Sequence, residues 1–484
     1  MAAKSLMIQG TCSDAGKSIL TAAFCRILKQ DGFKVAPFKS QNMALNSYVT
    51  LDGREIARAQ VVQAQAACLE PDIRMSPILL KPSSHTKSQI VLNGLPVEGM
   101  TWQQYMEFKP KAFEVVKESY DSLASEYGVV VLEGAGSPAE INLNHDDIVN
   151  MGMARYANAP VLLVGDIDRG GVFASFVGTY ELLCDWEREH LAGYLINKFR
   201  GDASLLKEAL DVTEERTGKT VLGTIPWVYD LGLPEEDAVR PKKTSSDTEL
   251  DIAIIGLNHL SNYTDFDAFD VEEDVSLRLV RKVEDLRDPD CIIIPGSKTT
   301  VSDLEFLKNN GMAQAILNFA AAGGSLIGIC GGFQMLGKKI YDHNCLESDH
   351  KEFSAFGLLD IDTSMAASKT LSRTRAKYNP KGYNVSGYEI HHGKTRIGDC
   401  EVILESDGKA LGVTKKNVWG TYLHGIFDND QFRRDFLNDL RRNQGLGEIQ
   451  KVSPYDLEPA FEKLAKTVRE NVDMEKIYKI MGLS

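Results

Sequence analysis

The chain has 484 residues, with 54 Lys and Arg against 68 Asp and Glu, and a formal net charge of −14 at pH 7. This length predicts two or three domains, and the 43% hydrophobic and 25% charged residues are typical of a soluble globular protein. The acidic balance argues against a nucleic-acid partner, and no apolar run reaches the ~18–20 residues that a membrane span needs.

The N-terminal sequence and the cysteines indicate the compartment. The first eight residues lead directly into an apolar run without the layout of a signal peptide. The eight cysteines are dispersed, and none forms a Cys-x-x-Cys pair. This usage favours a reducing cytoplasm and argues against a disulfide framework or a zinc site.

Short apolar runs alternate with longer helical stretches through the first half of the chain. Because the runs are continuously apolar, we expect strands that are buried on both faces, and therefore a parallel sheet. We expect a helix over residues 54–69, between the second and third runs. The runs are residues 6–8, 35–38, 129–132, 161–164 and 194–196.

The first run leads into a glycine-containing loop, GTCSDAGKS at residues 10–18, which opens a helix. Backbone N–H groups around Gly10, Thr11 and Gly16 are expected to surround phosphate oxygens at the helix N-terminus. Lys17 would supply a point charge, and Ser18 could bind Mg²⁺. The loop is one residue longer than the standard Walker A pattern, and it predicts an ATP site.

Other polar residues follow strands in the same half. Glu133 stands at the carboxyl end of an expected strand, where open α/β sheets bind ligands. This position predicts that Glu133 binds magnesium. Lys39 could neutralise phosphate charge. Asp52 is a second magnesium candidate, or equally an ordinary turn residue. Asp166 and Asp168 could hold magnesium or substrate, or could simply cap a loop.

A polar stretch separates this half from a second α/β pattern. We predict a first domain over residues 1–235, a linker over 236–250 and a second domain over 251–445. New apolar runs begin in the second domain at Ile252 and Cys291. The final residues, 446–484, show a helical apolar stripe and are expected to pack on the second domain.

A cysteine flanked by glycines follows the third run of the second domain, in GICGG at residues 328–332. At a strand-to-helix turn this pattern predicts a nucleophile elbow, in which Cys330 is exposed to substrate and the helix N-terminus favours its thiolate. A buried structural cysteine is the alternative. The N–H of Gly331 is expected in an oxyanion hole, and Gly296, in a turn after a strand, is a second possible donor.

His424 ends the strand-like run WGTYLHG at residues 419–425 and is the candidate base for Cys330. Together the two motifs resemble the class I glutamine amidotransferases. That resemblance implies that the Cys attacks the side-chain amide of glutamine and that the His moves the proton. Most members carry a Glu two residues after the His, where this chain has Ile426. The group that orients His424 is therefore left open.

The phosphate loop resembles that of dethiobiotin synthetase and lacks the early lysine of partition ATPases. The whole arrangement resembles the cobyric acid synthase family, with further matches at residues 132–143, 261–267 and 387–393. The resemblance implies two doubly wound, mostly parallel-sheet α/β domains, a P-loop NTPase-like domain and a class I glutaminase domain. It also implies ATP, Mg²⁺, glutamine and a corrinoid polycarboxylate as ligands, and amidation of four carboxylates of adenosylcobyrinic acid a,c-diamide.

Two rival functions stay open at this point. Cobyrinic acid a,c-diamide synthase shares both halves in the same order. A P-loop switch ATPase with an inactive glutaminase domain would explain Ile426, although Cys330 and His424 are both intact. Nothing in the sequence indicates the oligomeric state.

Overall fold

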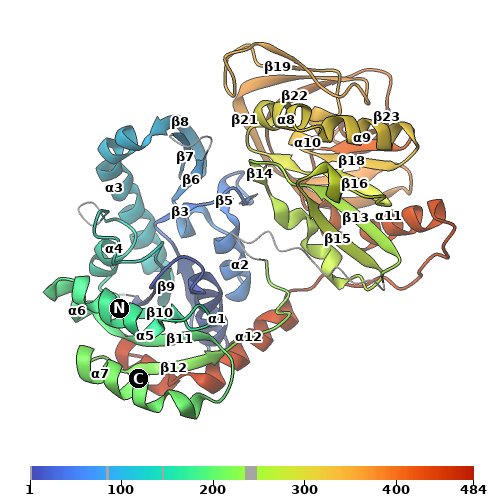
Figure 1. The fold of residues 1–484 in the computed structure, drawn as a ribbon. Helices are drawn as coiled ribbons and strands as arrows, with labels where there is room; N and C mark the ends of the chain where they lie inside the picture. Colours follow the sequence, from blue (N-terminus) through green and yellow to red (C-terminus); the bar gives the residue numbers. More distant parts are fainter. Residues whose placement is uncertain (1–2, 83–86, 144–146, 235–247, 484) are drawn as a thin grey trace. The chain divides into compact units, whose positions relative to one another are not determined.

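The computed structural model describes residues 3–82, 87–143, 147–234 and 248–483, and the chain divides into two compact α/β units (Figure 1). The first unit comprises residues 1–44, 56–237 and 456–484, and the second comprises 45–55 and 238–455. Residues 236–247 of the predicted linker, which spans 236–250, are not among the described residues. The α/β fold class with two such domains is confirmed, although each unit is discontinuous in sequence.

The first unit is built on a six-stranded sheet in the order β12-β11-β10-β1-β9-β2, in which every neighbouring pair is parallel. All five predicted apolar runs lie in these strands, which confirms them. The strands are β1 (Lys4–Gly10), β2 (Val35–Phe38), β9 (Val129–Glu133), β10 (Val161–Asp166), β11 (Leu191–Phe199) and β12 (Val221–Pro226).

Helices connect these strands, and a small second sheet is inserted after β2. Helix α2 (Arg58–Ala66) is shorter than the expected 54–69, because residues 55–57 are extended. The small sheet has the order β3-β6-β7-β8. Its strands are β3 (Gln41–Met43), β6 (Ile78–Pro82), β7 (Lys87–Leu92) and β8 (Leu95–Thr101). The other helices are α1 (Lys17–Gln30), α3 (Trp102–Glu126), α4 (Met151–Tyr156), α5 (Val172–Leu182), α6 (Asp185–His190) and α7 (Lys207–Thr217).

The C-terminal residues form two helices of the first unit, α12 (Glu458–Asn471) and α13 (Met474–Met481). The prediction that residues 446–484 pack on the glutaminase domain was wrong for residues 456–484, whereas residues 446–455 belong to the second unit. Phe461 and Val468 are buried in the core that contains α1 and β1. Val472 pairs with Gly223 of β12, and Asp473 caps α13, so the expected single helix is broken there. An apolar stripe predicts a helix but does not identify the core that it joins.

The second unit has an eleven-stranded sheet whose first five strands, in the order β15-β13-β16-β18-β25, are parallel. Six further strands extend it through pairings that are antiparallel except that of β19 with β21, an addition that the apolar runs did not indicate. The parallel strands are β13 (Leu250–Ile255), β15 (Val275–Val280), β16 (Cys291–Ile294), β18 (Ser325–Ile329) and β25 (Val418–Thr421). The others are β19 (Lys339–Tyr341), β20 (Glu352–Ser354), β21 (Ile361–Tyr378), β22 (Tyr383–Ile397), β23 (Glu401–Ser406) and β24 (Lys409–Lys415).

Helical elements of the second unit follow or connect the parallel strands. The α-helices are α8 (Thr300–Asn309), α9 (Met312–Ala321), α10 (Gly331–Met335) and α11 (Asp430–Asn443). Two 3₁₀ segments, η4 (Tyr263–Val271) and η6 (Ile426–Asp428), lie near the candidate catalytic histidine. The two-stranded pairing of β14 (Leu260–Ser261) with β17 (Gly296–Ser297) joins the start of η4 to the turn after β16.

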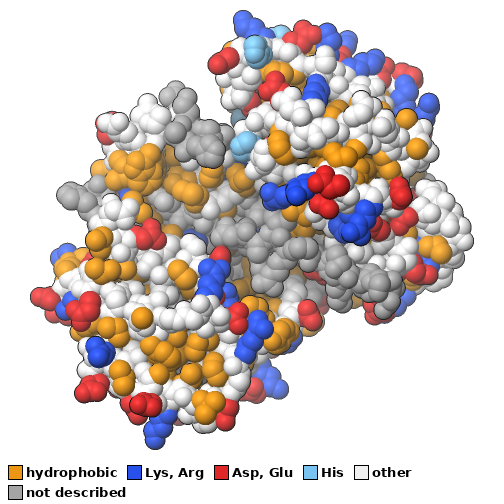
Figure 2. Space-filling model, in the orientation of Figure 1, with side chains coloured by type: hydrophobic (Ala, Val, Ile, Leu, Met, Phe, Trp, Pro, Cys, Tyr) orange, Lys and Arg blue, Asp and Glu red, His pale blue; other side chains and the backbone are white. Residues whose placement is uncertain are grey.

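Acidic and basic side chains are interspersed on the face of the molecule that Figure 2 shows. This mixture agrees with the composition, in which the acidic excess is spread over a long chain. Among the described residues, no helix has both the length and the apolar character that crossing a bilayer requires.

Candidate active sites

Cys330 stands at a strained turn between β18 and α10. Its backbone has φ 51° and ψ −104°, a conformation that a residue other than glycine rarely adopts. Gly332 makes the turn possible, because a Cβ there would lie 2.0 Å from the carbonyl oxygen of Ile294. The N–H of Cys330 donates to the carbonyl of Thr421 at 2.8 Å, which ties the elbow to β25. The geometry is that of the predicted nucleophile elbow.

His424 is buried three residues after the end of β25, and its ring contacts a carboxylate. Its Nδ1 lies 2.7 Å from Oδ2 of Asp265, a residue of η4. The other oxygen of Asp265 accepts a hydrogen bond from the N–H of Gly425 at 2.9 Å. Asp265 therefore holds both the imidazole and the backbone that follows it. It occupies the role that the residue two positions after the histidine has in most class I glutaminases.

The surroundings of His424 favour its protonated form. Burial disfavours the charge, but the Asp265 carboxylate and the Cys330 side chain outweigh burial and raise the pKa of His424 to about 10. An imidazolium beside a cysteine is the arrangement that stabilises a nucleophilic thiolate.

Strand β22 lies along the same pair of residues. The ring of Tyr388 stacks on the imidazole of His424 with centroids 5.3 Å apart and planes 19° apart. The two backbones exchange hydrogen bonds of 3.1 and 2.9 Å. Two residues further along β22, the carbonyl of Ile390 accepts the Sγ–H of Cys330 at 3.5 Å. This strand consequently fixes the position of the nucleophile and of its base.

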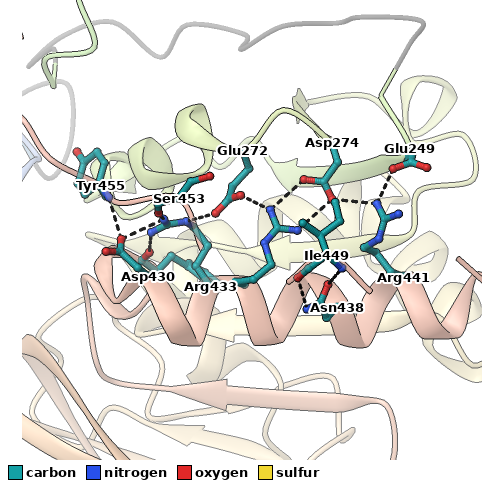
Figure 3. Close-up of polar contacts among 12 residues, drawn as sticks. Glu249, Glu272, Asp274, Asp430, Arg433, Asn438, Arg441, Ile449, Ser453 and Tyr455 are labelled. Atoms are coloured by element: carbon teal, nitrogen blue, oxygen red, sulfur yellow. Dashed lines mark hydrogen bonds and ion pairs between the residues drawn. The ribbon is translucent and has the colours of Figure 1, made fainter. Parts of the chain in front are cut away.

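A buried arginine on α11, Arg433, donates to Glu272 and to neighbouring backbone and carboxylate groups (Figure 3). Arg433 is fully buried, and its Nε donates to Glu272 at the end of η4 at 2.7 Å. Its Nη1 donates at 2.8 Å to the carbonyl of Phe427 in η6, three residues after His424. One guanidinium therefore joins the segment that carries Asp265 to the segment that follows His424, and its planar fork suits this double role.

The two glycines expected at an oxyanion hole lie close to this site. A Cβ on Gly296 would be 3.2 Å from Cε1 of His424, and a Cβ on Gly331 would be 2.8 Å from the backbone nitrogen of Ser297. Gly331 is the first residue of α10, whose leading N–H groups have no acceptor within the helix. The Ser297 hydroxyl is held by Asp303 at 2.6 Å. Gly296 is paired with Ser261 between β14 and β17. The oxyanion role of the two glycines stays a prediction.

The phosphate loop of the first unit surrounds the Lys17 ammonium. Lys17 donates to the carbonyls of Cys12 at 2.8 Å and Gly136 at 3.0 Å. Burial lowers the pKa of Lys17 from its ordinary value. Gly10 and Gly16 are required by close packing, since a Cβ would lie 3.1 Å from Cδ of Lys17 and 2.1 Å from Nδ2 of Asn197, respectively. The N–H of Thr11 continues the sheet by donating to Val164 at 2.9 Å, so this N–H does not point at a phosphate.

Glu133 is buried at the end of β9 and gathers three partners. Its carboxylate accepts hydrogen bonds from Ser18 at 2.8 Å, from Lys39 at 2.8 Å and from the Gln63 amide. Burial opposes its charge, but Lys39 and the hydrogen bonds hold the pKa of Glu133 below its ordinary value. Ser18 and Glu133 thus offer two adjacent hard oxygens of the kind that Mg²⁺ prefers.

Asp52 is not part of this cluster. It belongs to the second unit, while Ser18 and Glu133 belong to the first. Its carboxylate accepts a hydrogen bond from the Thr50 hydroxyl within a turn, and its side chain is 64% exposed. This environment matches the alternative that the sequence left open, an ordinary turn residue, and a metal role for Asp52 stays a prediction.

Comparison with known proteins assigns both units. A family model described as "CobQ/CobB/MinD/ParA nucleotide binding domain" matches residues 6–238, and one described as "CobB/CobQ-like glutamine amidotransferase domain" matches residues 251–432. A cobyric acid synthase of Nitratidesulfovibrio vulgaris is 52% identical over 99% of this chain and 98% of its own length. One from Thermoanaerobacter sp. is 48% identical over 99% of each chain. The chain belongs to the cobyric acid synthase family.

Two residues of this cobyric acid synthase family member were not identified from the sequence alone. Asp265 lies within the 261–267 stretch that indicated the family, but nothing local marks its carboxylate as the partner of His424, 159 residues away. Gln63 is a neutral residue on α2, and no pattern distinguishes it from its neighbours. Both roles follow from tertiary contacts.

Proposed function

We propose that the protein catalyses the ATP- and glutamine-dependent amidation of the b, d, e and g carboxylates of adenosylcobyrinic acid a,c-diamide, which yields adenosylcobyric acid. Family membership supports the reaction class, because relatives named cobyric acid synthase align with the chain from end to end. The observation that carries the proposal at the chemical level is the set Cys330, His424 and Asp265, which joins a nucleophile, a base and an orienting carboxylate.

The glutamine reaction is assigned to the second unit. The sulfur of Cys330 attacks the side-chain amide of glutamine, and His424 donates a proton to the departing ammonia. Water then attacks the thioester carbonyl, His424 takes a proton from that water, and glutamate leaves with Cys330 restored. Asp265 holds the imidazole in one orientation and stabilises its charged form. N–H groups at Gly331 and Gly296 are suited to stabilise the oxyanion of each tetrahedral intermediate.

The activation of the acceptor is assigned to the first unit. A corrinoid carboxylate oxygen attacks the γ-phosphorus of ATP, the bond to the β-phosphate oxygen breaks, and ADP leaves. Ammonia attacks the resulting acyl phosphate, and phosphate departs as the amide forms. Lys17 is placed to leave the carbonyls of Cys12 and Gly136 and to bind phosphate oxygens. Positioning and charge neutralisation, rather than covalent catalysis by the protein, supply the acceleration.

A magnesium ion fits the polar cluster at the end of β9. Ser18 and Glu133 would hold it, and Lys39, which now neutralises Glu133, is placed to turn toward phosphate instead. Bound magnesium would neutralise negative charge on the phosphates. The charged state of Glu133 that its partners favour is the state in which it can serve as a ligand.

The test is mass spectrometry of adenosylcobyrinic acid a,c-diamide incubated with the protein, ATP, Mg²⁺ and glutamine. We expect four successive conversions of acid to amide, each accompanied by release of one glutamate. Reactions without ATP or without the nitrogen donor serve as controls. An acceptor whose mass stays unchanged with glutamine and also with ammonium would overturn the proposed function.

A further inference from the structure

The Asp265–His424 contact depends on how two short 3₁₀ segments of the second unit pack against each other. Asp265 lies on η4, and His424 precedes η6 by two residues. Oδ2 of Asp265 lies 2.7 Å from Nδ1 of His424, and its Oδ1 accepts the N–H of Gly425 at 2.9 Å. A shift of ~1 Å between the segments would carry both contacts beyond hydrogen-bonding distance.

Aromatic side chains hold the two segments together. Phe269 of η4 lies against Phe427 of η6, with ring centroids 4.7 Å apart, and the ring centroid of Phe266 lies 6.5 Å from that of Phe427. Burial of this apolar surface stabilises the packing, but the hydrophobic effect is non-directional. Directional bonds are therefore needed to fix the separation of η4 and η6 as closely as the Asp265–His424 contact requires.

Arg433 of α11 supplies directional bonds to both segments. Its Nε donates to Oε1 of Glu272, the residue after η4, at 2.7 Å, as Figure 3 shows. Glu272 is itself tied to η4, because its N–H donates to the carbonyl of Phe269 at 3.1 Å. Nη1 of Arg433 donates at 2.8 Å to the carbonyl of Phe427 in η6. The arginine is fully buried, so bulk water could not replace either bond.

The remaining nitrogen of Arg433 fixes the orientation of the guanidinium itself. Nη2 donates to Oδ1 of Asp430 at 3.1 Å and to the carbonyl of Ser453. Asp430 lies in the first turn of α11 and also accepts the N–H of Tyr455 at 2.8 Å. Because all three nitrogens are bonded, the planar group has one orientation and acts as a rigid spacer between η4 and η6.

The other buried arginines of α11 show what is particular to Arg433. Arg434 donates to Asp274 at 3.0 and 3.2 Å and to the second oxygen of Glu272. Arg441 donates to Asp274 at 3.0 Å. Within the described part of the chain, Arg433 is the one of these three that also bonds to η6. The bridge between η4 and η6 is therefore a property of this residue and not of the whole ionic cluster.

We propose that Arg433 is a positioning residue for glutamine hydrolysis, which sets the separation of η4 and η6 and thereby keeps Asp265 in contact with the imidazole of His424. The proposal rests on the glutamine reaction of the proposed function. Its bonds lead to Glu272 and Phe427 and not to the reacting groups, so Arg433 acts through Asp265. Loss of the bridge lengthens the Asp265–His424 contact and leaves the imidazole less able to keep the proton that departing ammonia needs.

The first experiment compares Arg433→Lys with the wild type in glutamine hydrolysis across pH 6–10. Lysine keeps the charge but lacks the planar fork that reaches Glu272 and Phe427 together. We expect kcat to fall by about 10²-fold, the scale of a ~1 Å misplacement, with little change in KM. The alkaline limb of the kcat profile should move to lower pH. Arg441→Lys, the same substitution on the same helix, is the matched control and should change neither.

A double-mutant cycle tests whether Arg433 acts through Asp265. In an Asp265→Asn background, Arg433→Lys should cause little further loss of kcat, because the contact that the arginine positions is already weakened. Losses that multiply in the double variant would show that the two residues act independently, and they would overturn the proposal. An unchanged kcat and pH profile in Arg433→Lys alone would also overturn it.

Glu272→Asp weakens the same bridge from its other end and provides a second variant should Arg433→Lys fail to fold. The shorter side chain keeps the charge and withdraws the carboxylate from Arg433 by one methylene. We expect the same two effects at a smaller size, a lower kcat and an alkaline limb at lower pH. If only this variant folds, an unchanged kcat and profile in Glu272→Asp overturns the proposal.

Hydrogen exchange and ammonium-dependent amidation separate failure of this proposal from failure of the proposed function. In Arg433→Lys, exchange should rise in peptides that cover 263–272 and 424–428 and stay unchanged in peptides that cover 291–297, whether or not glutamine is hydrolysed. Unchanged exchange in the first two regions would overturn the proposal. Amidation with ammonium should proceed at the wild-type rate, because the nucleotide site lies in the other unit. Loss of that activity together with glutamine hydrolysis would indicate a general structural role and overturn the proposal, whereas a wild type that releases no glutamate would overturn the proposed function.

Discussion

Asp265 and His424 are 159 residues apart in the sequence, and a contact of 2.7 Å joins Oδ2 of the first to Nδ1 of the second. The glutaminase site therefore has a carboxylate-oriented histidine although Ile426 stands where most class I glutaminases carry a glutamate. The carboxylate reaches the same imidazole from η4, on the N-terminal side of the nucleophile, instead of from the turn after the histidine. This geometry counts against an inactive glutaminase domain.

Replacing Asp265 by Asn should strongly slow glutamine hydrolysis and should not affect ATP-dependent amidation with ammonia. The amide cannot stabilise the imidazolium, so kcat should fall on the order of 10²- to 10⁴-fold. The pKa of His424 should also drop, which moves the alkaline limb of the rate profile to lower pH. Steady-state glutaminase assays across pH 6–10 test both effects. An unchanged profile in this variant would remove Asp265 from the mechanism, and ammonia-dependent amidation is the control.

Replacing Cys330 by Ala should abolish glutamine-dependent amidation without harming amidation from ammonium. The nucleophile is lost, whereas the phosphate loop lies in the other unit. Product formation with each nitrogen source, measured side by side, is the readout. Cys291→Ala, at a buried cysteine of β16 outside the site, serves as a matched control. Simultaneous loss of both activities in the Cys330 variant would contradict two separable sites.

Replacing Lys17 by Ala should stop amidation from either nitrogen source. The variant lacks the ammonium group that now donates to the carbonyls of Cys12 and Gly136 and that we expect to bind phosphate oxygens of ATP. Amidation assays with glutamine and with ammonium should both show a loss of at least ~10²-fold, the scale of one lost electrostatic stabiliser. Lys4→Ala, at the start of β1 and so at the far end of that strand from the phosphate loop, should have little effect. Ammonia-dependent synthesis that survives in Lys17→Ala would exclude the loop from the reaction.

The raised pKa of His424 predicts that the free energy of unfolding decreases as the pH rises. It is raised from 6.5 to about 10 in the folded protein, so the folded state binds one more proton than the unfolded state between these values. The stabilisation is complete below pH 6.5 and is lost as the pH rises toward 10. Over this window the free energy of unfolding should fall more steeply with rising pH than it does in His424→Gln. Urea unfolding of both proteins at pH 7, 8 and 9 measures the difference, and parallel slopes would refute it.

Replacing Phe461 by Ala should destabilise the nucleotide unit. The ring is buried in the core of the first unit, and removing it should cost about 3–5 kcal/mol of that unit's stability. Phe461→Leu should cost less. Thermal unfolding followed by hydrogen exchange separates the two units. Loss of protection confined to β13, β16 and β18 would show that α12 supports the other core after all.

The sequence predicted what is local and missed what is formed by distant contacts. Cys330 and Lys17 each stand in a short pattern whose backbone conformation determines their role, so both sites could be located. The five apolar runs of the first half became five strands of one sheet for the same reason. The role of Asp265 could not be predicted, because nothing in the sequence indicates that η4 approaches the end of β25. The position of Phe461 could not be predicted either, because the sequence does not indicate which core α12 joins. Asp52 shows why a local pattern can leave two roles open, because a carboxylate next to a glycine fits a turn as well as a metal site.

The place of α12 and α13 has a consequence for how the polypeptide is made. The core of the first unit includes Phe461, Leu464 and Val468, which the ribosome adds after the whole of residues 238–455. The nucleotide unit therefore stays unfinished during translation while the glutaminase unit can already complete its own sheet. A single cut between residues 234 and 248 would separate the first unit from α12 and α13, and the second unit from residues 45–55.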